Sequence, residues 1–282
     1  MKLGLVLEGG ASRTVFSCGV MDVLLSNKIY ADYVIGTSAG IAYGTSYASK
    51  QIGRNRQVAV KYMSDKRYMG AKHLLNPKNR SYYNLDFVFS DIPNKEVLFD
   101  FEEFSKFPGD VIATVTSLRT GEVEYLPVTA EDKGFTVLRA SCALPIMFKP
   151  IEIEGKKYLD GGVGDPIPYK KALADGCDKI IVILTREEGY RKESDGSEKL
   201  VKLLYGRHPE LVNTFLKRAQ IYNDSIDALE KLQKEGKALV IRPEKIEGIA
   251  RTEKNPEILE NLYQQGITIG SKKIKEISEF IK

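Results

Sequence analysis

A serine lies between two glycines in the segment Gly36-Thr37-Ser38-Ala39-Gly40, which has the G-x-S-x-G spacing of a nucleophile elbow. The apolar residues 33–35 before it are typical of a short buried strand, and a helical pattern opens after it. On such a turn the serine hydroxyl projects above the edge of the sheet, where it can attack a carbonyl carbon. The spacing alone is a weak signal, because an ordinary glycine-rich turn with a solvated serine would also produce it. The strand, turn and helix together favour a nucleophile.

A serine nucleophile needs a base, and histidine is the usual one. The chain contains two histidines, His73 and His208. His73 lies within a basic segment, and His208 precedes Pro209 at an expected helix start. Neither follows a strand end in a motif that would aim an imidazole at Ser38. The sequence therefore gives poor support to a Ser-His-Asp triad and favours a structural or surface role for both histidines.

A carboxylate is the better candidate for the base. Asp160 follows a short expected strand, and Gly161 and Gly162 come directly after it. An acid at a strand end, followed by two glycines, lies in an open turn that could share a rim with the turn of Ser38. The alternative is a β-turn in which the Asp160 side chain only accepts a hydrogen bond.

A second glycine-rich turn could stabilise the negative charge that develops on a carbonyl oxygen. Residues Glu8-Gly9-Gly10-Ala11-Ser12-Arg13 follow the first expected strand and precede a helix. Backbone amides in such a turn can point at an anion. The helix that begins after Ser38 adds positive potential at its first turn. The glycines do not match G-x-G-x-x-G, so the pattern gives only weak support to dinucleotide binding.

Together these segments resemble the patatin-like phospholipase family. The resemblance rests on Leu5-Val6-Leu7-Glu8-Gly9-Gly10 with Arg13, on the elbow around Ser38, and on Asp160-Gly161-Gly162. Residues 140–145 are similar to the family's block ahead of the Asp-Gly-Gly turn, and residues 166–168 and 178–185 are similar to its continuation. The likeness covers residues 3–185, and three motifs in the family's order are far more specific than any one of them.

The resemblance implies an α/β fold, a three-layer α/β/α sandwich with a mostly parallel central sheet. It also implies a Ser-Asp dyad that acts on acyl esters of lipids, with Ser38 as the nucleophile and Asp160 as the base. The oxyanion hole would be formed near Gly9, Gly10, Ala11 and Arg13, and the elbow and turn glycines would be Gly36, Gly40, Gly161 and Gly162. The reaction that the resemblance implies calls for no metal and no other cofactor.

Two residues depart from the family pattern. Ala11 stands where the family usually has a third glycine, and Thr14 stands where it has a glycine after the basic residue. An alanine keeps its amide, but it fits poorly if the loop needs a positive φ at that position. The two departures therefore bear on the geometry of the oxyanion hole and on the rate of reaction.

The expected function is that of a serine acyl hydrolase of the phospholipase A or lysophospholipase type, which works through an acyl-enzyme. A general carboxylesterase or thioesterase is an alternative, because the same dyad would serve. Acyl transfer between thioesters is disfavoured, since such transferases commonly carry a histidine where this chain has Thr37. The alternative from another class is a catalytically silent lipid- or phosphate-binding protein, which would suit Ala11, Thr14 and the basic segment.

The alternation of strand and helix patterns predicts an α/β protein with a mostly parallel sheet. Strands are expected over residues 3–7, 33–35, 111–116, 122–127, 151–153, 157–159, 179–184 and 238–241. Helices are expected over residues 13–25, after Ser38, and over 169–174, 209–234 and 255–282. The polar segment 187–199 predicts a mobile loop. We expect one domain over residues 1–282, with a helical C-terminal extension over 209–282.

Residues 50–80 form a strongly basic segment, although the formal net charge of the whole chain is only +4. The segment holds one acid, Asp65, and nine basic residues: Lys50, Arg54, Arg56, Lys61, Lys66, Arg67, Lys72, Lys78 and Arg80. A surface of this kind can contact anionic membrane headgroups or phosphate esters. The alternative is a solvated helical face. Nucleic acid is disfavoured as a partner, because no binding motif accompanies the charge.

Three cysteines, Cys18, Cys142 and Cys177, lie in apolar or helical patterns with no C-x-x-C pair. This usage predicts free thiols in a reducing compartment, so the cytoplasm is the expected location. No stretch reaches the roughly 18 apolar residues that a membrane span needs. The apolar run over residues 3–7 is too short for the core of a signal peptide and predicts a buried strand.

Overall fold

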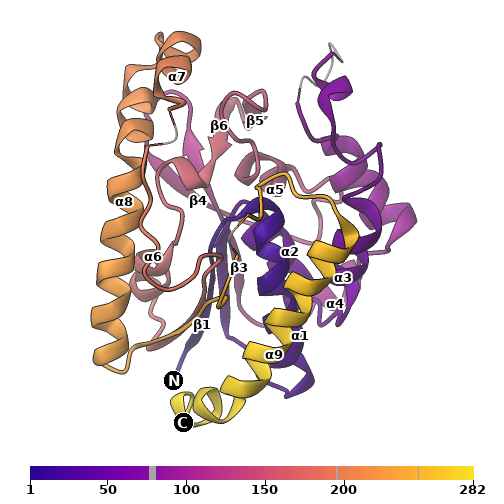
Figure 1. Ribbon diagram of the computed structural model, residues 1–282, viewed down its shortest axis with the longest axis vertical. Coiled ribbons are helices and arrows are strands. Elements are labelled where there is room, and N and C mark those ends of the chain that lie inside the picture. Colours follow the sequence, from indigo (N-terminus) through magenta and orange to yellow (C-terminus); the bar gives the residue numbers. More distant parts are fainter. Residues whose placement is uncertain (76–80, 195, 247) are drawn as a thin grey trace.

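A central β-sheet with helices on both faces dominates the computed structural model, which describes residues 1–75, 81–194, 196–246 and 248–282 (Figure 1). Its parallel strands lie in the order β3-β2-β1-β7-β8, with bounds Asp110–Ser117, Tyr33–Thr37, Leu3–Leu7, Lys179–Ile183 and Ala238–Ile241. The antiparallel strands β4 (Val123–Pro127), β5 (Ile151–Ile153) and β6 (Lys156–Asp160) extend the sheet beyond β3. The mostly parallel sheet is therefore as predicted.

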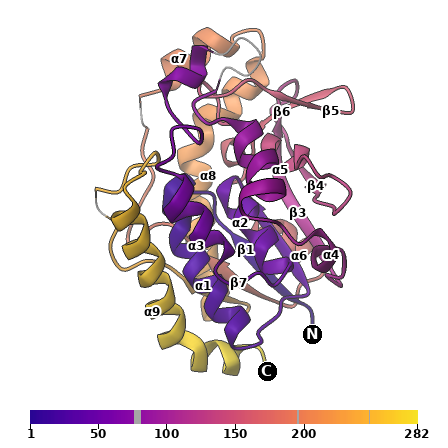
Figure 2. The ribbon, with the colours of Figure 1, turned by 90° about the vertical axis from the view of Figure 1, so that its right-hand side faces the viewer.

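Side chains of the parallel strands alternate between two apolar layers, as the period of a strand requires. In β1, Leu5 and Leu7 face one layer and Val6 faces the other. The first layer is covered by helices α1 (Val15–Ser26), α2 (Ala39–Ala48) and α9 (Pro256–Phe280), onto which Figure 2 looks. The second is covered by α6 (Tyr169–Ala174) and α8 (Pro209–Lys234). This arrangement confirms the predicted three-layer sandwich.

Short helices fill the chain between β2 and β3, where the sequence patterns assigned no elements. They are α3 (Arg54–Gln57), the π-helices η2 (Val58–Tyr62) and η4 (Phe87–Glu96), the 3₁₀-helix η3 (Ala71–Leu75) and α4 (Phe101–Ser105). Such short turns cannot display a 3.6-residue period over several turns, and Pro93 lies inside η4. The helix α5 (Thr136–Ser141) is short for the same reason.

Among the boundaries that differ from the predicted elements, three lie beside the candidate site. The helix expected over residues 13–25 is a 3₁₀ turn, η1 (Ala11–Thr14), followed by α1. The second strand continues through Thr37, so β2 ends directly before Ser38. The strand expected over residues 157–159 continues through Asp160, so that this residue ends β6, and another 3₁₀ turn, η5 (Gly161–Val163), follows it. Both candidate catalytic residues therefore stand at a junction between a strand and a helical turn.

The C-terminal helix α9 packs closely along α1. At their crossing Gly19 meets Gly266, and a Cβ on Gly266 would lie 2.1 Å from the carbonyl oxygen of Phe16. Nearby, the Tyr263 hydroxyl donates a 2.7 Å hydrogen bond to the buried carboxyl of Asp22. The extension is therefore fastened to the first helix of the sandwich. In the described parts of the chain, no helix combines the length and the apolar character that crossing a membrane requires.

The segment expected to be a mobile loop differs in part from that prediction. Its last residues begin helix α7 (Glu198–Tyr205), which the sequence patterns missed. Upstream, Lys192 and Asn223 of α8 exchange two hydrogen bonds, of 2.8 and 3.1 Å, and Arg191 pairs with Asp227 at 2.6 Å. Arg191 and Lys192 of this segment are thus held against α8. Residue 195 lies outside the described residues.

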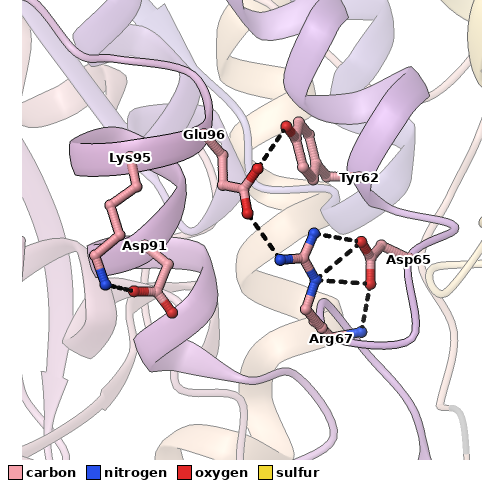
Figure 3. Close-up of polar contacts among 6 residues, drawn as sticks. All are labelled: Tyr62, Asp65, Arg67, Asp91, Lys95 and Glu96. Atoms are coloured by element: carbon pink, nitrogen blue, oxygen red, sulfur yellow. Dashed lines mark hydrogen bonds and ion pairs between the residues drawn. The ribbon is translucent and has the colours of Figure 1, made fainter.

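Three cations of the basic segment, Lys50, Arg56 and Arg67, form ion pairs with acids, most of which come from elsewhere in the chain. Figure 3 shows Arg67 between Asp65 and Glu96, at 2.8 and 2.7 Å. Two further ion pairs are Lys50 with Glu103 at 2.7 Å and Arg56 with Glu260 at 2.8 Å. The segment is therefore not one free positive surface. Its Lys78 and Arg80 lie outside the described residues.

Candidate active site

Ser38 joins β2 to α2 in a backbone conformation that few side chains adopt. Its φ is 55° and its ψ is −133°. Such strain persists only where the surroundings hold it, and it is common at functional turns. The glycines of the elbow are required by packing against the end of β1. A Cβ added to Gly36 would lie 2.9 Å from the Cβ of Leu7. A Cβ added to Gly40 would lie 2.6 Å from the carbonyl oxygen of Glu8.

The pairing of β3 brings Ser38 and Asp160 together. β2 pairs with β3 up to Thr37, which lies opposite Thr114. β6 runs the other way and pairs with the next part of β3, so that Asp160 lies opposite Val115. Because β4 occupies the other edge of β3, β2 and β6 share one edge and meet end to end. The last residue of β6 therefore faces the first residue after β2.

The Asp160 carboxyl is buried and only partly hydrogen-bonded. Its Oδ1 accepts a 2.7 Å hydrogen bond from the Gly162 amide, whereas Oδ2 has no hydrogen-bond partner among the described residues. Burial raises the pKa of Asp160 to about 6, and the nearby Ser38 hydroxyl and the Gly162 amide oppose part of that rise. Hydrogen bonds between catalytic groups are often long before a substrate binds. One carboxylate oxygen is thus left for a proton near Ser38.

The glycine-rich turn after β1 lies beside the elbow. A Cβ on Gly9 would lie 3.1 Å from the Ser38 Cβ and 2.9 Å from the Thr37 carbonyl oxygen. A Cβ on Gly10 would overlap the Thr185 side chain at 2.6 Å. Both positions need glycine because the backbone passes its neighbours so closely. In the same way, a Cβ on Gly161 would overlap a carbonyl of β3 at 2.3 Å.

The amides of this turn differ in their partners. The Gly9 amide donates to the Pro166 carbonyl at 3.4 Å, and the Ser12 amide donates to a carbonyl of the C-terminal extension at 3.1 Å. The backbone hydrogen bonds of the described residues engage neither the Gly10 amide nor the Ala11 amide. These two amides can therefore donate to a ligand oxygen, which is the property that an oxyanion hole needs.

The two departures from the family pattern have different consequences. Ala11 has a φ of 49°, so the loop does adopt the left-handed conformation that favours glycine. Thr14 has ordinary helical angles, φ −64° and ψ −11°, and its side chain is buried. The strain is thus confined to Ala11, and Thr14 imposes none on the backbone.

Arg13 and Glu8 are both buried beside the same turn. The Arg13 side chain is 6% exposed, and its Nε has no hydrogen-bond partner among the described residues. Burial, together with the nearby charges of Arg186 and Arg251, lowers the pKa of Arg13 to about 10. Glu8 accepts a 2.5 Å hydrogen bond from the Thr185 amide, and burial raises its pKa.

An apolar cavity of about 110 Å³ begins at Ser38. Its walls come from α2, η2, η4, α5 and the segment before α4, and they include Tyr43, Val58, Phe89, Ile92, Phe99 and Leu138. Arg54 also lines it, with its guanidinium bound to the carbonyl oxygens of Val97 and Leu98 at 3.0 and 3.2 Å. A cavity of this composition fits an alkyl or acyl chain.

A polar cavity of about 70 Å³ shares Ala11, Ser38 and Leu144 with the apolar one. Its lining includes Asp160 and Glu8 and five cationic side chains, those of Arg13, Arg186, Lys192, Arg218 and Arg251. Ser38 thus stands where an apolar cavity and a cationic cavity meet. This arrangement can hold a molecule with a hydrocarbon part and an anionic part, joined at the serine.

The histidines lie outside both cavities. The Nε2 atom of His73 contacts the Lys66 carbonyl oxygen at 3.0 Å, and His208 stands at the start of α8. In the described residues, no three His, Cys, Asp or Glu side chains gather closely enough to hold a metal ion. Asp160, and neither histidine, is therefore the candidate base that the fold brings near Ser38.

Sequence reasoning assigned several residues of the site no individual role, although Ser141 and Cys142 lie in the block 140–145 that resembles the family. Ser141 accepts a 2.9 Å hydrogen bond from the Ser38 amide, and Cys142 borders the apolar cavity. Cys142, like the buried Cys18 and Cys177, is a free thiol, as predicted. The cations that line the polar cavity beyond Arg13 lie in no motif. Only the folded chain brings them together.

Comparison with known proteins bears on each half of the chain. A family model described as patatin-like phospholipase matches residues 5–173, and one described as a domain of unknown function (DUF6363) matches residues 208–282. The uncharacterized protein YjjU of Escherichia coli strain K12 is 27% identical over 189 residues, covering 65% of this chain and 52% of the relative. Lysophospholipase NTE1 of Scheffersomyces stipitis is 25% identical over 259 residues, covering 86% of this chain and 16% of the relative.

The chain therefore spans about half the length of the first relative and a small part of the second. Among solved structures, the crystal structure of VipD from Legionella pneumophila has a TM-score of 0.53 with this chain. The match covers 98% of this chain and 67% of VipD at 12% sequence identity. At that identity the likeness concerns the fold alone.

Proposed function

Because the chain belongs to the patatin-like phospholipase family, we propose that it is a serine acyl hydrolase that cleaves carboxylic ester bonds of lipids. The observation that carries the proposal is the end-to-end meeting of β2 and β6, which sets Ser38 beside Asp160. The apolar cavity at Ser38 supports an acyl group as part of the substrate. Relatives named as lysophospholipases support a lipid ester.

In the proposed reaction, the Ser38 hydroxyl oxygen attacks the ester carbonyl carbon while Asp160 takes the hydroxyl proton. The amides of Gly10 and Ala11 hold the oxyanion of the tetrahedral intermediate. When the bond to the leaving oxygen breaks, Asp160 returns the proton to the leaving alcohol. Water then attacks the acyl-enzyme with the same base and the same amides, which releases the fatty acid and restores Ser38.

The pKa of Asp160 matters to this proposal, because an ordinary aspartate has a pKa of about 3.9 and is a weak base. At about 6, its carboxylate is ionised at neutral pH and holds a proton more firmly. An acyl chain in the apolar cavity would exclude further water from the carboxyl group and act in the same direction.

Labelling with a fluorophosphonate, read by intact mass, tests the proposed dyad. Wild type should gain one adduct, Ser38→Ala none, and Asp160→Asn should react far more slowly. The double variant His73→Ala, His208→Ala is the control and should label like wild type. Failure of folded wild type to label would support the silent lipid- or phosphate-binding alternative. Loss of labelling in the folded histidine variant would refute Asp160 as the base.

Contact with an anionic membrane surface is the second part of the proposal. Two elements with exposed leucines lie at the upper end of the molecule in Figures 1 and 2, on opposite sides of it in Figure 1. They are η3, where Leu75 is 83% exposed, and α7, where Leu203 is 79% exposed. Lysines accompany both, Lys72 in η3 and Lys202 in α7. Exposed leucines beside lysines suit the surface of an anionic bilayer.

A cytoplasmic location completes the proposal. It is supported by the three cysteines, which are all free thiols. Disulfides form in oxidising compartments, so free thiols suit a reducing one.

A further inference from the structure

The polar cavity beside Ser38 contains more positive charge than the proposed hydrolysis uses. Five cationic side chains line it, against two carboxyl groups. One of the two is Asp160, the proposed base, and the other is Glu8, which the Thr185 amide already engages. Cations gathered at one site repel each other, and a bound anion relieves that repulsion. The excess charge therefore points to an anionic ligand.

Arg13 gives a second, independent indication. Arg13 is only 6% exposed, and it lines the cavity. Its Nε atom has no hydrogen-bond partner among the described residues. One contact of its guanidinium is a 3.4 Å hydrogen bond to the Ile249 carbonyl. A buried donor without an acceptor is costly unless a ligand supplies one. Guanidinium groups match phosphate oxygens in geometry as well as in charge.

The aromatic side chains of the cavity argue against a quaternary ammonium group. Such a cation binds over the faces of aromatic rings. Tyr190 already has the Arg186 guanidinium over its ring at 4.1 Å, and Tyr222 has the Lys192 ammonium at 5.4 Å. A zwitterionic headgroup would therefore bring its positive end into a cavity that is already positive.

Four of the five cations lie beyond the part of the chain that matches the patatin-like family model, which ends at residue 173. Arg186 and Lys192 belong to the segment between β7 and α7. Arg218 on α8 and Arg251 before α9 belong to the stretch that matches the domain of unknown function. The C-terminal extension thus completes one wall of the cavity.

We propose that this cationic cavity binds the phosphate group of the leaving alcohol. The inference rests on the proposed function and names its substrate class: acyl esters whose alcohol carries a phosphomonoester and no quaternary ammonium. The acyl chain lies in the apolar cavity and the phosphate in the polar one. The ester bond breaks between them, and the phosphate leaves unchanged on the alcohol.

Kinetics on three substrates with one common acyl chain test this assignment. They are 1-acylglycerol 3-phosphate, 1-acylglycerol and 1-acylglycerophosphocholine, presented in the same neutral detergent micelles. Wild type should prefer the phosphomonoester over each of the others by at least about tenfold in kcat/KM. Equal kcat/KM values for the phosphomonoester and the neutral glyceride would overturn the proposal.

Variants then locate the effect. Arg186→Gln and Arg251→Gln should each reduce the preference for the phosphomonoester severalfold. Arg119→Gln is the matched control, because Arg119 is exposed in the turn between β3 and β4 and lines neither cavity. The ratio of two substrates is the readout because Arg251 also acts on Asp160, and a change in the chemical step cancels in that ratio. An unchanged ratio in both cavity variants would refute the site.

A binding measurement separates this inference from the proposed function. The Ser38→Ala variant, titrated calorimetrically with glycerol 3-phosphate and with inorganic phosphate, should bind both, more weakly at high salt. The double variant Ser38→Ala, Arg186→Gln should bind both ligands more weakly than Ser38→Ala does. Absence of binding, with wild-type Ser38 still labelled by a fluorophosphonate, would refute the phosphate site alone. Binding of phosphate that does not compete with the ester substrate would show a free anion site and overturn the role in leaving-group recognition.

Discussion

The carboxyl group of Asp160 links activity to pH. Its pKa of about 6 means that it is ionised at neutral pH and protonated in acid. If it is the base, kcat/KM for a neutral ester should fall about tenfold per pH unit below this pKa, because the protonated form cannot accept the serine proton. A pH profile on a substrate that does not itself titrate measures this. A profile that stays flat down to pH values well below 6 would contradict the role of Asp160.

The same carboxyl group should make the folded protein less stable at neutral pH. Its folded pKa is raised above the ordinary value, so ionisation of this group opposes folding. The penalty is complete above the folded pKa, shrinks as pH falls through it, and is gone below the ordinary pKa. Asp160→Asn should therefore raise the free energy of unfolding at pH 7 by about 2–3 kcal/mol, and the gain should shrink in acid. Urea denaturation at two pH values measures it. A variant less stable than wild type at both would contradict this account.

Ala11 is the strained residue of the oxyanion turn. A residue other than glycine in the left-handed conformation costs roughly 1 kcal/mol, so Ala11→Gly should raise stability by up to about that amount while activity is kept or increased. Lys28→Gly is the matched control, because Lys28 also has a positive φ, 57°, but lies outside both cavities. Denaturation and kcat/KM are measured for both. A tenfold loss of activity in Ala11→Gly alone would mean that the alanine methyl group positions the loop.

At the residue scale, sequence reasoning works where function demands a local pattern. Ser38 needs a turn between glycines, and Asp160 needs the turn formed by Gly161 and Gly162, so both leave a readable signal. Their catalytic roles stay predictions, but the fold does bring them together. Arg186 and Arg251 need only point into a shared cavity, which imposes no spacing along the chain. Such residues become visible only in three dimensions.

At the scale of elements, helix α7 offers a test of membrane contact. Its exposed Leu203 and Leu204 should enter the surface of anionic vesicles, so Leu203→Ser with Leu204→Ser should weaken vesicle binding at least about tenfold. Leu98→Ser is the matched control, because Leu98 is 66% exposed but lies in the segment before α4. Vesicle sedimentation measures binding. Equal binding of the double variant and wild type would refute a role for α7.

Elements were predictable in proportion to their regularity. The buried strands and the long helices α8 and α9 follow from apolar runs and a 3.6-residue period. The short helices η2, η3 and η4 carry no such period, so the region between β2 and β3 could not be assigned. Helix α7 was missed because it has only 8 residues, too few to display a 3.6-residue period over several turns.

At the scale of the whole molecule, the packing of α9 on α1 suggests one cooperative unit, and we propose a single domain over residues 1–282. Gly266→Ala would force its new methyl group against the Phe16 carbonyl, which should destabilise the whole chain by about 1–3 kcal/mol. Gly134→Ala is the control, since the nearest atom to a Cβ there lies at 3.6 Å. Thermal unfolding is followed by circular dichroism and by tyrosine fluorescence. Two separate transitions, with only one shifted by Gly266→Ala, would contradict a single domain.

The end-to-end meeting of β2 and β6 has a practical consequence for chain cleavage. The turn of the β5–β6 hairpin lies at the exposed residues Glu154 and Gly155. In the sequence this turn comes after Ser38 and before Asp160. Cutting there leaves the nucleophile on one fragment and the base on the other. Neither fragment could turn over substrate alone. Recovered turnover on mixing them would report, through chemistry, that two pieces of polypeptide have reassembled along β3.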